Sequence, residues 1–162
     1  MDIRLARIDD RLIHGQVATV WSKETQVERI IVCNDEVAKD EIRSTLLKQV
    51  APPGVKSNVV DVEKGIRVYN NPTYKTTPVM LLFTNPSDVL RMVEAGVPIT
   101  TVNIGGIAYR DGRKQITNAI SVGPEDIEAF RKLDEKGIEL EIRKVAADSK
   151  VKMIPLLDKE GL

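Results

Sequence analysis

Short apolar runs rich in β-branched residues alternate along this chain with longer stretches whose apolar residues recur with a helical period. This alternation is typical of β–α units, so the pattern predicts an α/β protein whose sheet is largely parallel. The strands are expected at residues 2–8, 28–34, 56–62, 77–84, 98–106 and 138–145. The second of these segments is apolar at nearly every position, so we expect it at the centre of the sheet.

Helices are expected between these strands, at residues 15–24, 35–50, 62–71, 85–96 and 124–137. The buried face of the first helix is expected to hold Val17, Val20 and Trp21. The second helix is expected to begin at Asp35 as its cap and to bury Val37, Ile42, Leu46 and Val50. These sets follow from the spacing of one helix face.

Two segments depart from the alternation. Residues 108–123 are expected to form two short extended arms around a turn at Asp111 and Gly112, because Asp-Gly between extended arms is a hairpin signal. Residues 148–157 are expected to form a short helix or an extended tail.

Composition favours one compact domain over residues 1–162. The apolar fraction is 42%, and a chain of this length buries roughly two thirds of its unfolded surface. The 24 basic and 24 acidic residues cancel, so there is no overall positive field to attract nucleic acid. Neither a signal peptide nor an apolar window of membrane-spanning length is recognisable, so a cytoplasmic, soluble protein is expected.

In an open parallel sheet, ligands bind outside the carboxyl ends of the strands, where loops meet the N-termini of helices. The loops expected there are residues 9–16, 34–36, 84–88 and 103–113.

The first of these loops holds His14, the only histidine in the chain. Imidazole is the side chain that titrates near neutral pH, so His14 is the candidate nucleophile or general base. Gly15 lets the backbone approach closely, the helix start at Gln16 offers unpaired N–H groups, and Arg11 adds a forked cation. These groups describe a site for an oxyanion beside an imidazole, although a lone histidine is more often structural or solvated.

Asp9 and Asp10 precede this arginine. Because neighbouring strand residues point to opposite sides, we expect one aspartate to orient His14 or Arg11 and the other to cap the loop. Zinc is excluded, since one histidine and one cysteine, Cys33, provide too few ligands. Magnesium held by carboxylates stays open, and Cys33 is expected to be a buried strand residue.

Thr84 and Arg110 belong to two of the other loops. The hydroxyl of Thr84 is a candidate phosphate donor, with helix capping as the equal alternative. Arg110 is a candidate for contact with a phosphate or a partner, and a solvated hairpin tip is the alternative.

The segment RIDDRLIHGQVATVW, residues 7–21, resembles the phosphorylation-site loop of the IIB domain of mannose-family (mannose–fructose–sorbose) sugar phosphotransferase systems. The likeness continues along nearly the whole chain, through IIVCND, LLFTNPSDVLRMVEAGVPI, VNIGG, KQITNAISV and FRKLDEKGIELEIRKV. It implies a three-layer α/β/α fold, with an open, mainly parallel sheet of about seven strands and helices on both faces.

The resemblance also implies a function. His14 matches the histidine that accepts a phosphoryl group from a phosphohistidine of the IIA partner and passes it to a sugar held by the membrane subunits IIC and IID. Asp9 and Arg11 match the residues that support the imidazole and the phosphoryl group, and Gly15 and Gln16 match the turn that completes the pocket. No cofactor is required, IIA is expected to be a separate protein, and membrane contact runs only through the partner subunits.

Leu12 and Ile13 are expected to form an apolar collar for partners around His14, and the equal alternative is that both are core residues. The rival function is a noncatalytic α/β module that binds a sugar phosphate or a nucleotide at the strand-end loops. A phosphohistidine phosphatase or mutase is a third possibility, but it calls for a second histidine or a further arginine on this loop.

Overall fold

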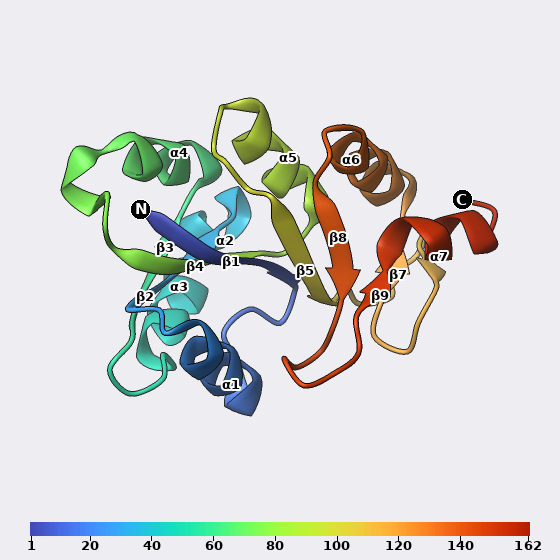
Figure 1. Cartoon of the computed structure of the whole chain (residues 1–162). Coiled ribbons are helices and arrows are strands. Elements are labelled where there is room, and N and C mark those ends of the chain that lie inside the picture. The colour runs from blue at the N-terminus through green and yellow to red at the C-terminus, as the bar shows by residue number, and fades with distance from the viewer.

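A seven-stranded sheet in the order β3-β2-β4-β1-β5-β8-β9 forms the middle layer of the protein (Figure 1). The computed structural model describes the backbone of residues 1–162 and every side chain except those of Gln16 and Val17. Neighbouring strands pair in parallel, except β8 and β9, which are antiparallel. The strands of this sheet are β1 (Asp2–Asp9), β2 (Arg29–Cys33), β3 (Lys56–Val60), β4 (Pro78–Phe83), β5 (Thr101–Gly106), β8 (Glu139–Ile142) and β9 (Val151–Lys152).

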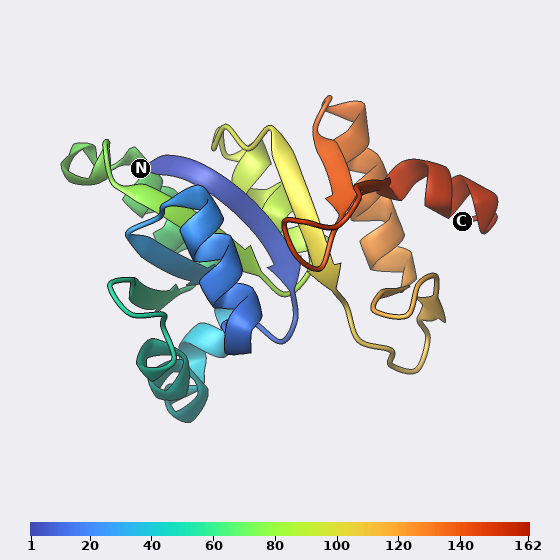
Figure 2. The same ribbon diagram turned by 60° about the horizontal axis from the view of Figure 1, so that its bottom comes forward.

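Helices cover both faces of this sheet. In Figures 1 and 2, α1 and α3 lie on one face, while α4, α5 and α6 lie on the other. The helices are α1 (Gly15–Thr25), α2 (Asp35–Lys39), α3 (Glu41–Gln49), α4 (Val62–Asn70), α5 (Pro86–Glu94), α6 (Pro124–Glu135) and α7 (Met153–Lys159), with a 3-10 turn, η1 (Pro72–Tyr74). The architecture confirms the predicted mainly parallel α/β fold.

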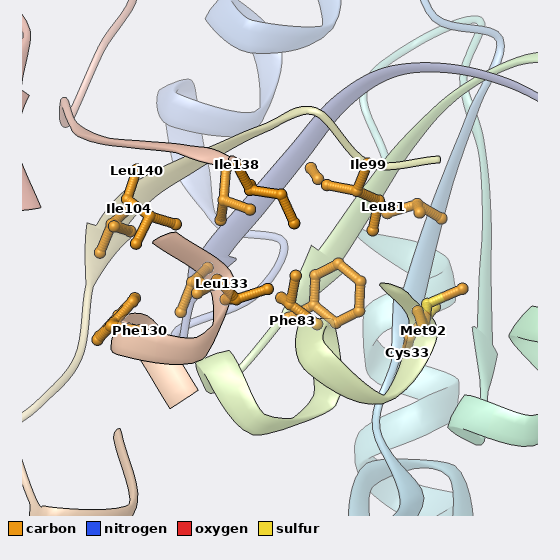
Figure 3. Close-up of a cluster of buried hydrophobic side chains, with 14 of the residues drawn as sticks. Cys33, Leu81, Phe83, Met92, Ile99, Ile104, Phe130, Leu133, Ile138 and Leu140 are labelled. Carbon is orange, nitrogen blue, oxygen red and sulfur yellow. The ribbon is translucent and has the colours of Figure 1, made fainter. Parts of the chain in front are cut away.

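Two apolar clusters form the core, one on each side of the sheet. On β2, Ile30 and Val32 belong to one cluster, while Ile31 and Cys33 belong to the other, because successive strand residues point to opposite faces. Figure 3 shows part of the larger cluster, where side chains of α5 and α6 pack on the strands. Cys33 is fully buried, as expected, and burial raises the pKa of its thiol.

Double-sided burial also explains why one expectation about strand order is wrong. The second strand is apolar at nearly every position, yet β2 lies next to the edge strand β3 and is not central. The central strand is β1, which pairs with β4 and β5. An uninterrupted apolar run therefore reports helices on both faces rather than a place in the middle of the sheet.

The segment 35–50 forms two helices and not the single helix expected. Asp40 is extended between α2 and α3, and its carboxylate accepts a hydrogen bond from the Arg43 backbone N–H. The caps are Asn34 and Asp40 rather than Asp35. Because a new helix begins after Asp40, the buried residues differ from the expected face. Val37 and Leu47 lie inside.

The remaining residues of the expected face are exposed, at 77% for Ile42, 57% for Leu46 and 52% for Val50. In α1, Trp21 is buried, but Val20 is 40% exposed. The expectation for the Val17 side chain lies outside the described residues. Continuous helical periodicity over a capping aspartate was thus misleading, because the cap competes with helix continuation.

The predicted hairpin exists, but its turn lies further along the chain. Strands β6 (Lys114–Gln115) and β7 (Ser121–Val122) pair in antiparallel fashion, so the connection is residues 116–120 and not Asp111-Gly112. The Thr117 hydroxyl accepts hydrogen bonds from the backbone N–H groups of Ala119 and Ile120, which closes this turn. The C-terminal segment combines both expected forms, strand β9 followed by helix α7.

Within the described residues, no helix is both long and apolar enough to cross a membrane.

Candidate functional site

His14 lies at the junction between the central strand and the first helix. After β1 ends, the Leu12 backbone N–H donates to the carbonyl of Asp9 at 2.8 Å, and Leu12 adopts a left-handed backbone conformation with φ of 61°. The chain then enters α1 with His14 as the residue that precedes it. The first amides of a helix have no partner within that helix, and they carry its positive dipole end. The imidazole therefore stands where an anion is favoured.

Leu12 and Ile13 anchor this loop in the core. They are only 2% and 4% exposed, and both belong to the apolar cluster that includes Trp21. The expected apolar collar around His14 is therefore wrong, and the alternative of two core residues holds. Two consecutive buried side chains fix the loop backbone, and with it the position of the imidazole.

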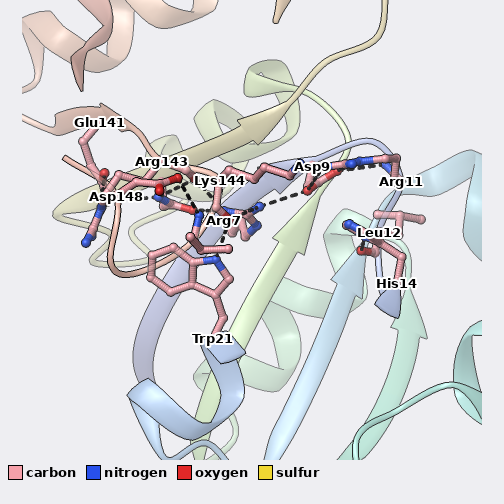
Figure 4. Close-up of polar contacts among 12 residues, drawn as sticks. Arg7, Asp9, Arg11, Leu12, His14, Trp21, Glu141, Arg143, Lys144 and Asp148 are labelled. Carbon is pink, nitrogen blue, oxygen red and sulfur yellow. Dashed lines mark hydrogen bonds and ion pairs between the residues drawn. The ribbon is translucent and has the colours of Figure 1, made fainter. Parts of the chain in front are cut away.

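The imidazole is turned towards its own loop. Its Nδ1 lies 2.8 Å from the carbonyl oxygen of Leu12 (Figure 4). A carbonyl only accepts hydrogen bonds, so in this orientation Nδ1 is the nitrogen that carries the hydrogen. Nε2 is buried and has no hydrogen-bond partner among the described residues.

Arg11 and Asp9 form a two-point ion pair beside the imidazole. Nε of Arg11 donates to Oδ1 of Asp9 and Nη2 donates to Oδ2, each at 3.1 Å. The Arg11 backbone N–H adds a third bond to Oδ1 at 3.2 Å. The Asp9 carboxylate is fully buried, whereas the Arg11 side chain is 46% exposed. The hydrogen bonds that Arg11 donates to Asp9 raise the pKa of Arg11, so its guanidinium keeps its positive charge.

A second arginine lies behind the same carboxylate. Nη2 of Arg7 donates to Oδ2 of Asp9 at 3.0 Å, and the Arg7 side chain is 3% exposed. Two guanidinium groups thus share one carboxylate. Burial lowers the pKa of Arg7, while Asp9 opposes this effect.

Arg7 was missed by the sequence analysis, although the sequence contains a sign of it. An arginine in the middle of an apolar strand, two residues before an aspartate, lies on the same strand face as that aspartate.

Asp10 points away from this ion pair and connects two loops. Its carboxylate accepts from the Ala108 backbone N–H at 2.7 Å, and its carbonyl accepts from Arg43 at 3.4 Å. Asp9 thus binds Arg11, whereas Asp10 binds the loop after β5.

Thr84 and Arg110 line a separate polar cavity of about 310 Å³, together with Asp10, Asn34 and Asp88. His14 does not line it. The Thr84 hydroxyl accepts hydrogen bonds from the side-chain amides of Asn34 and Asn85, the two residues that cap α2 and α5. Burial raises the pKa of the neighbouring Asp88. The structure therefore groups Thr84 with the helix caps rather than with the imidazole.

Gly15 begins α1 with φ of +44°, a conformation that favours glycine. The side chain of Gln16 lies outside the described residues. Among the residues whose side chains are described, no group of three or more histidine, cysteine or carboxylate side chains could hold a metal ion.

The protein is thus an open-sheet α/β protein that carries a histidine loop at the carboxyl end of its central strand. Residues 3–162 match the family described as the PTS system sorbose subfamily IIB component, and the chain belongs to that family.

Curated relatives support the match. The chain is 66% identical over 159 residues to the PTS system mannose-specific EIIAB component of Escherichia coli (strain K12), which covers 98% of this chain and 49% of that protein. The chain thus spans about half the length of this relative. It is 59% identical to the PTS system sorbose-specific EIIB component of Klebsiella pneumoniae, over 95% of this chain and 94% of that one.

The fold matches a solved structure equally well. The crystal structure of the IIBSor domain of the sorbose permease from Klebsiella pneumoniae superposes with a TM-score of 0.96 at 57% identity, and the match covers 98% of both chains. The resemblance inferred from the loop sequence is therefore confirmed at the level of the family and of the fold.

Proposed function

We propose that this chain is a phosphocarrier of a sugar phosphotransferase system, with His14 as the phosphoacceptor. In this proposal His14 receives a phosphoryl group from a phosphohistidine of a IIA partner and passes it to a sugar held by the membrane subunits IIC and IID. The observation that carries it is the placement of the only histidine between a helix N-terminus and an arginine clamped on Asp9. The names of its relatives, which are IIB components, support the same reaction class.

The proposed chemistry is a balanced transfer. A ring nitrogen of His14 attacks phosphorus, its P–N bond forms as the donor P–N bond breaks, and the donor nitrogen keeps the electron pair. The donor ring gains a proton, and the His14 ring loses one. In the second step a sugar hydroxyl attacks, and its proton goes to the departing His14 nitrogen.

Arg11 has a defined part in this scheme. Phosphoryl transfer spreads negative charge over three equatorial oxygens, so catalysis rests on positioning and on cationic or N–H donors. The Nε and Nη2 atoms of Arg11 are held by Asp9, which leaves the remaining N–H groups of the half-exposed guanidinium for the phosphoryl oxygens. One arginine with helix amides holds the group without the tight binding that would impede onward transfer.

The orientation of the His14 ring adds one requirement. Nδ1 is hydrogen-bonded to the Leu12 carbonyl, and Nε2 is buried. An in-line attack needs a ring nitrogen with a free lone pair facing the donor, so in the proposed reaction the ring turns about its side-chain bonds before transfer. In the proposed reaction, the His14 ring rotates when the donor protein docks.

The test is intact-protein mass after incubation with phosphoenolpyruvate, the general phosphotransferase proteins and a mannose-family IIA. We expect one acid-labile phosphoryl group on the wild type and none on His14→Ala, with equal thermal unfolding of the two proteins. Absence of phosphorylation with several competent IIA donors would overturn the proposal in favour of a noncatalytic binding module. That module would bind sugar phosphates equally well with and without His14.

A further inference from the structure

A network of buried polar side chains runs from Asp9, away from the His14 loop, across three strands of the sheet (Figure 4). Asp9, Arg7, Asn103 and Glu141 are each 2% exposed or less. They belong to three neighbouring strands, β1, β5 and β8. The network ends at Arg143, which binds the Glu141 carboxylate with its Nε at 2.7 Å and its Nη2 at 2.8 Å.

Arg7 is the centre of this network of buried side chains. Its Nη1 donates to the side-chain oxygen of Asn103 and to the carbonyl of Arg143, and its Nη2 donates to Asp9 and to the carbonyl of Lys144. Taking an arginine out of water is costly unless its donors are satisfied. Four acceptors converging from three segments of the chain hold this guanidinium in one orientation.

The neighbouring strand is shaped to admit this arginine. A Cβ placed on Gly105 of β5 would lie 2.0 Å from Nη2 of Arg7 and 2.3 Å from its central guanidinium carbon. Such distances are far inside van der Waals contact, so any side chain at Gly105 would displace the guanidinium. Glycine at this position is therefore a condition for the Arg7–Asp9 ion pair.

Trp21 connects the same arginine to the helix that begins beside His14. The guanidinium carbons of Arg7 and Arg143 lie 5.4 Å and 5.1 Å from the centre of its ring, within the range of cation–π attraction. The indole Nε1 donates to the Lys144 carbonyl at 3.0 Å. Arg7 thus contacts both supports of the site, the carboxylate that clamps Arg11 and the helix that follows the imidazole.

We infer that Arg7 is a positioning residue for phosphoryl transfer, which fixes the Asp9 carboxylate and through it the guanidinium of Arg11. This inference rests on the proposed function of His14 and Arg11. Asp9 offers two oxygens, and its Oδ2 is shared between Arg7 and Arg11. Without Arg7 the carboxylate keeps its bonds from Arg11. Its Oδ2 then loses the donor that ties it to the buried side chains of the sheet, so the fork that presents the free N–H groups of Arg11 is held less firmly. Arg7 itself touches no reacting atom.

The test compares single-turnover phosphoryl transfer from phosphorylated IIA to the wild type, Arg7→Lys, Arg11→Ala and the double variant. Lysine keeps the charge of Arg7 but not its fork. We expect Arg7→Lys to slow transfer by about tenfold or more, with an unchanged dependence on IIA concentration. In the Arg11→Ala background the same substitution is expected to cause no further loss, because Arg7 acts through Arg11.

The matched control is Arg29→Lys. Arg29 is a strand arginine that binds the side chain of Asn58, on strands β2 and β3, and its replacement is expected to leave the transfer rate unchanged. If Arg7→Lys does not fold, Asn103→Ala removes one acceptor from Nη1 of Arg7 while keeping the arginine. It is expected to slow transfer several-fold in the wild type but not in Arg11→Ala.

Three outcomes are distinct. A normal rate in folded Arg7→Lys, or equal slowing with and without Arg11, would overturn the positioning role and leave the proposed function intact. Failure of the wild type to accept phosphate would overturn the proposed function itself. Slowing that disappears in the Arg11→Ala background supports both. His14 is the only histidine, so its ring resonances report without overlap whether each variant keeps the loop in place.

Discussion

Arg11 binds Asp9 through two parallel hydrogen bonds, Nε to Oδ1 and Nη2 to Oδ2, each 3.1 Å long. The carboxylate is fully buried, while almost half of the arginine side chain meets solvent. A two-point ion pair with one buried and one accessible end presents a cation in a fixed orientation. The proposed role of Arg11, stabilisation of the phosphoryl group during transfer, rests on this geometry.

The first prediction concerns the fork itself. Arg11→Lys retains the positive charge but loses the two-point contact, so we expect phosphoryl transfer from IIA to be slower than in the wild type and faster than in Arg11→Ala. For Arg11→Ala the expected loss is about 100-fold. Rapid-quench measurement of phosphoryl transfer checks both. Arg4→Ala, at the other end of β1 and paired with Asp2, is the control, and equal rates for lysine and arginine would contradict a role for the fork.

The second prediction concerns the backbone of Leu12. At φ of 61° the backbone of Leu12 is in the left-handed region, which costs leucine free energy but which glycine adopts freely. Leu12→Gly and Leu12→Ala both remove the buried side chain, so we expect both to be destabilised, by about 2–4 kcal/mol. The glycine variant is expected to be the more stable of the two by about 1 kcal/mol, against the usual order.

Urea unfolding of the two variants measures this difference. The control is the same pair at Ile13, which is also buried but has an ordinary negative φ. There alanine is expected to be the more stable. Equal stabilities at Leu12 would show that the left-handed conformation carries no cost.

The third prediction distinguishes two helices from one over residues 35–50. Leu47 is buried, whereas its neighbour Leu46 is 57% exposed. Leu47→Ala is expected to lower the free energy of unfolding by about 2–3 kcal/mol, and Leu46→Ala by about 0.5 kcal/mol or less. Denaturant titration of the two variants is sufficient, and the reverse order would restore the single continuous helix.

The fourth prediction is a pH dependence of stability that depends on Asp35. Its carboxylate accepts from the Val62 backbone N–H and from Arg91, each at 3.0 Å. The bond from Val62, followed by the ion pair with Arg91, lowers the pKa of Asp35. A depressed pKa in the folded state stabilises the ionised form. Its contribution is therefore complete above the pKa of the unfolded chain and is lost as pH falls towards the folded value.

Because Asp35 is partly exposed, this contribution is small, about 0.5–1 kcal/mol. Unfolding free energies of the wild type and Asp35→Asn, measured from pH 7 down to pH 3, are expected to differ at neutral pH and to converge in acid. A difference that grows as pH falls would have the wrong sign and would refute the assignment.

Much of the site could be predicted from the sequence because its residues are neighbours in the chain. Asp9, Arg11, His14 and Gly15 lie within one loop, and the expected edge of the sheet follows from the β–α alternation. Within the His14 loop, the expectation that failed depended on burial. Leu12 and Ile13 are core residues rather than a collar. No local sequence pattern distinguishes an apolar residue that packs into the core from one that is exposed on a partner-binding surface.

The sequence by itself determined the alternation of strands and helices along the chain, the α/β class, and a histidine loop at the end of the first strand, because these depend on local periodicity and neighbouring residues. Only the tertiary structure decided that Arg7, which binds Asp9, lies against Gly105. They lie 98 positions apart and meet only because β1 and β5 pair. Such contacts depend on which strands become neighbours, and hydrophobic periodicity specifies the face of a strand but not its partner.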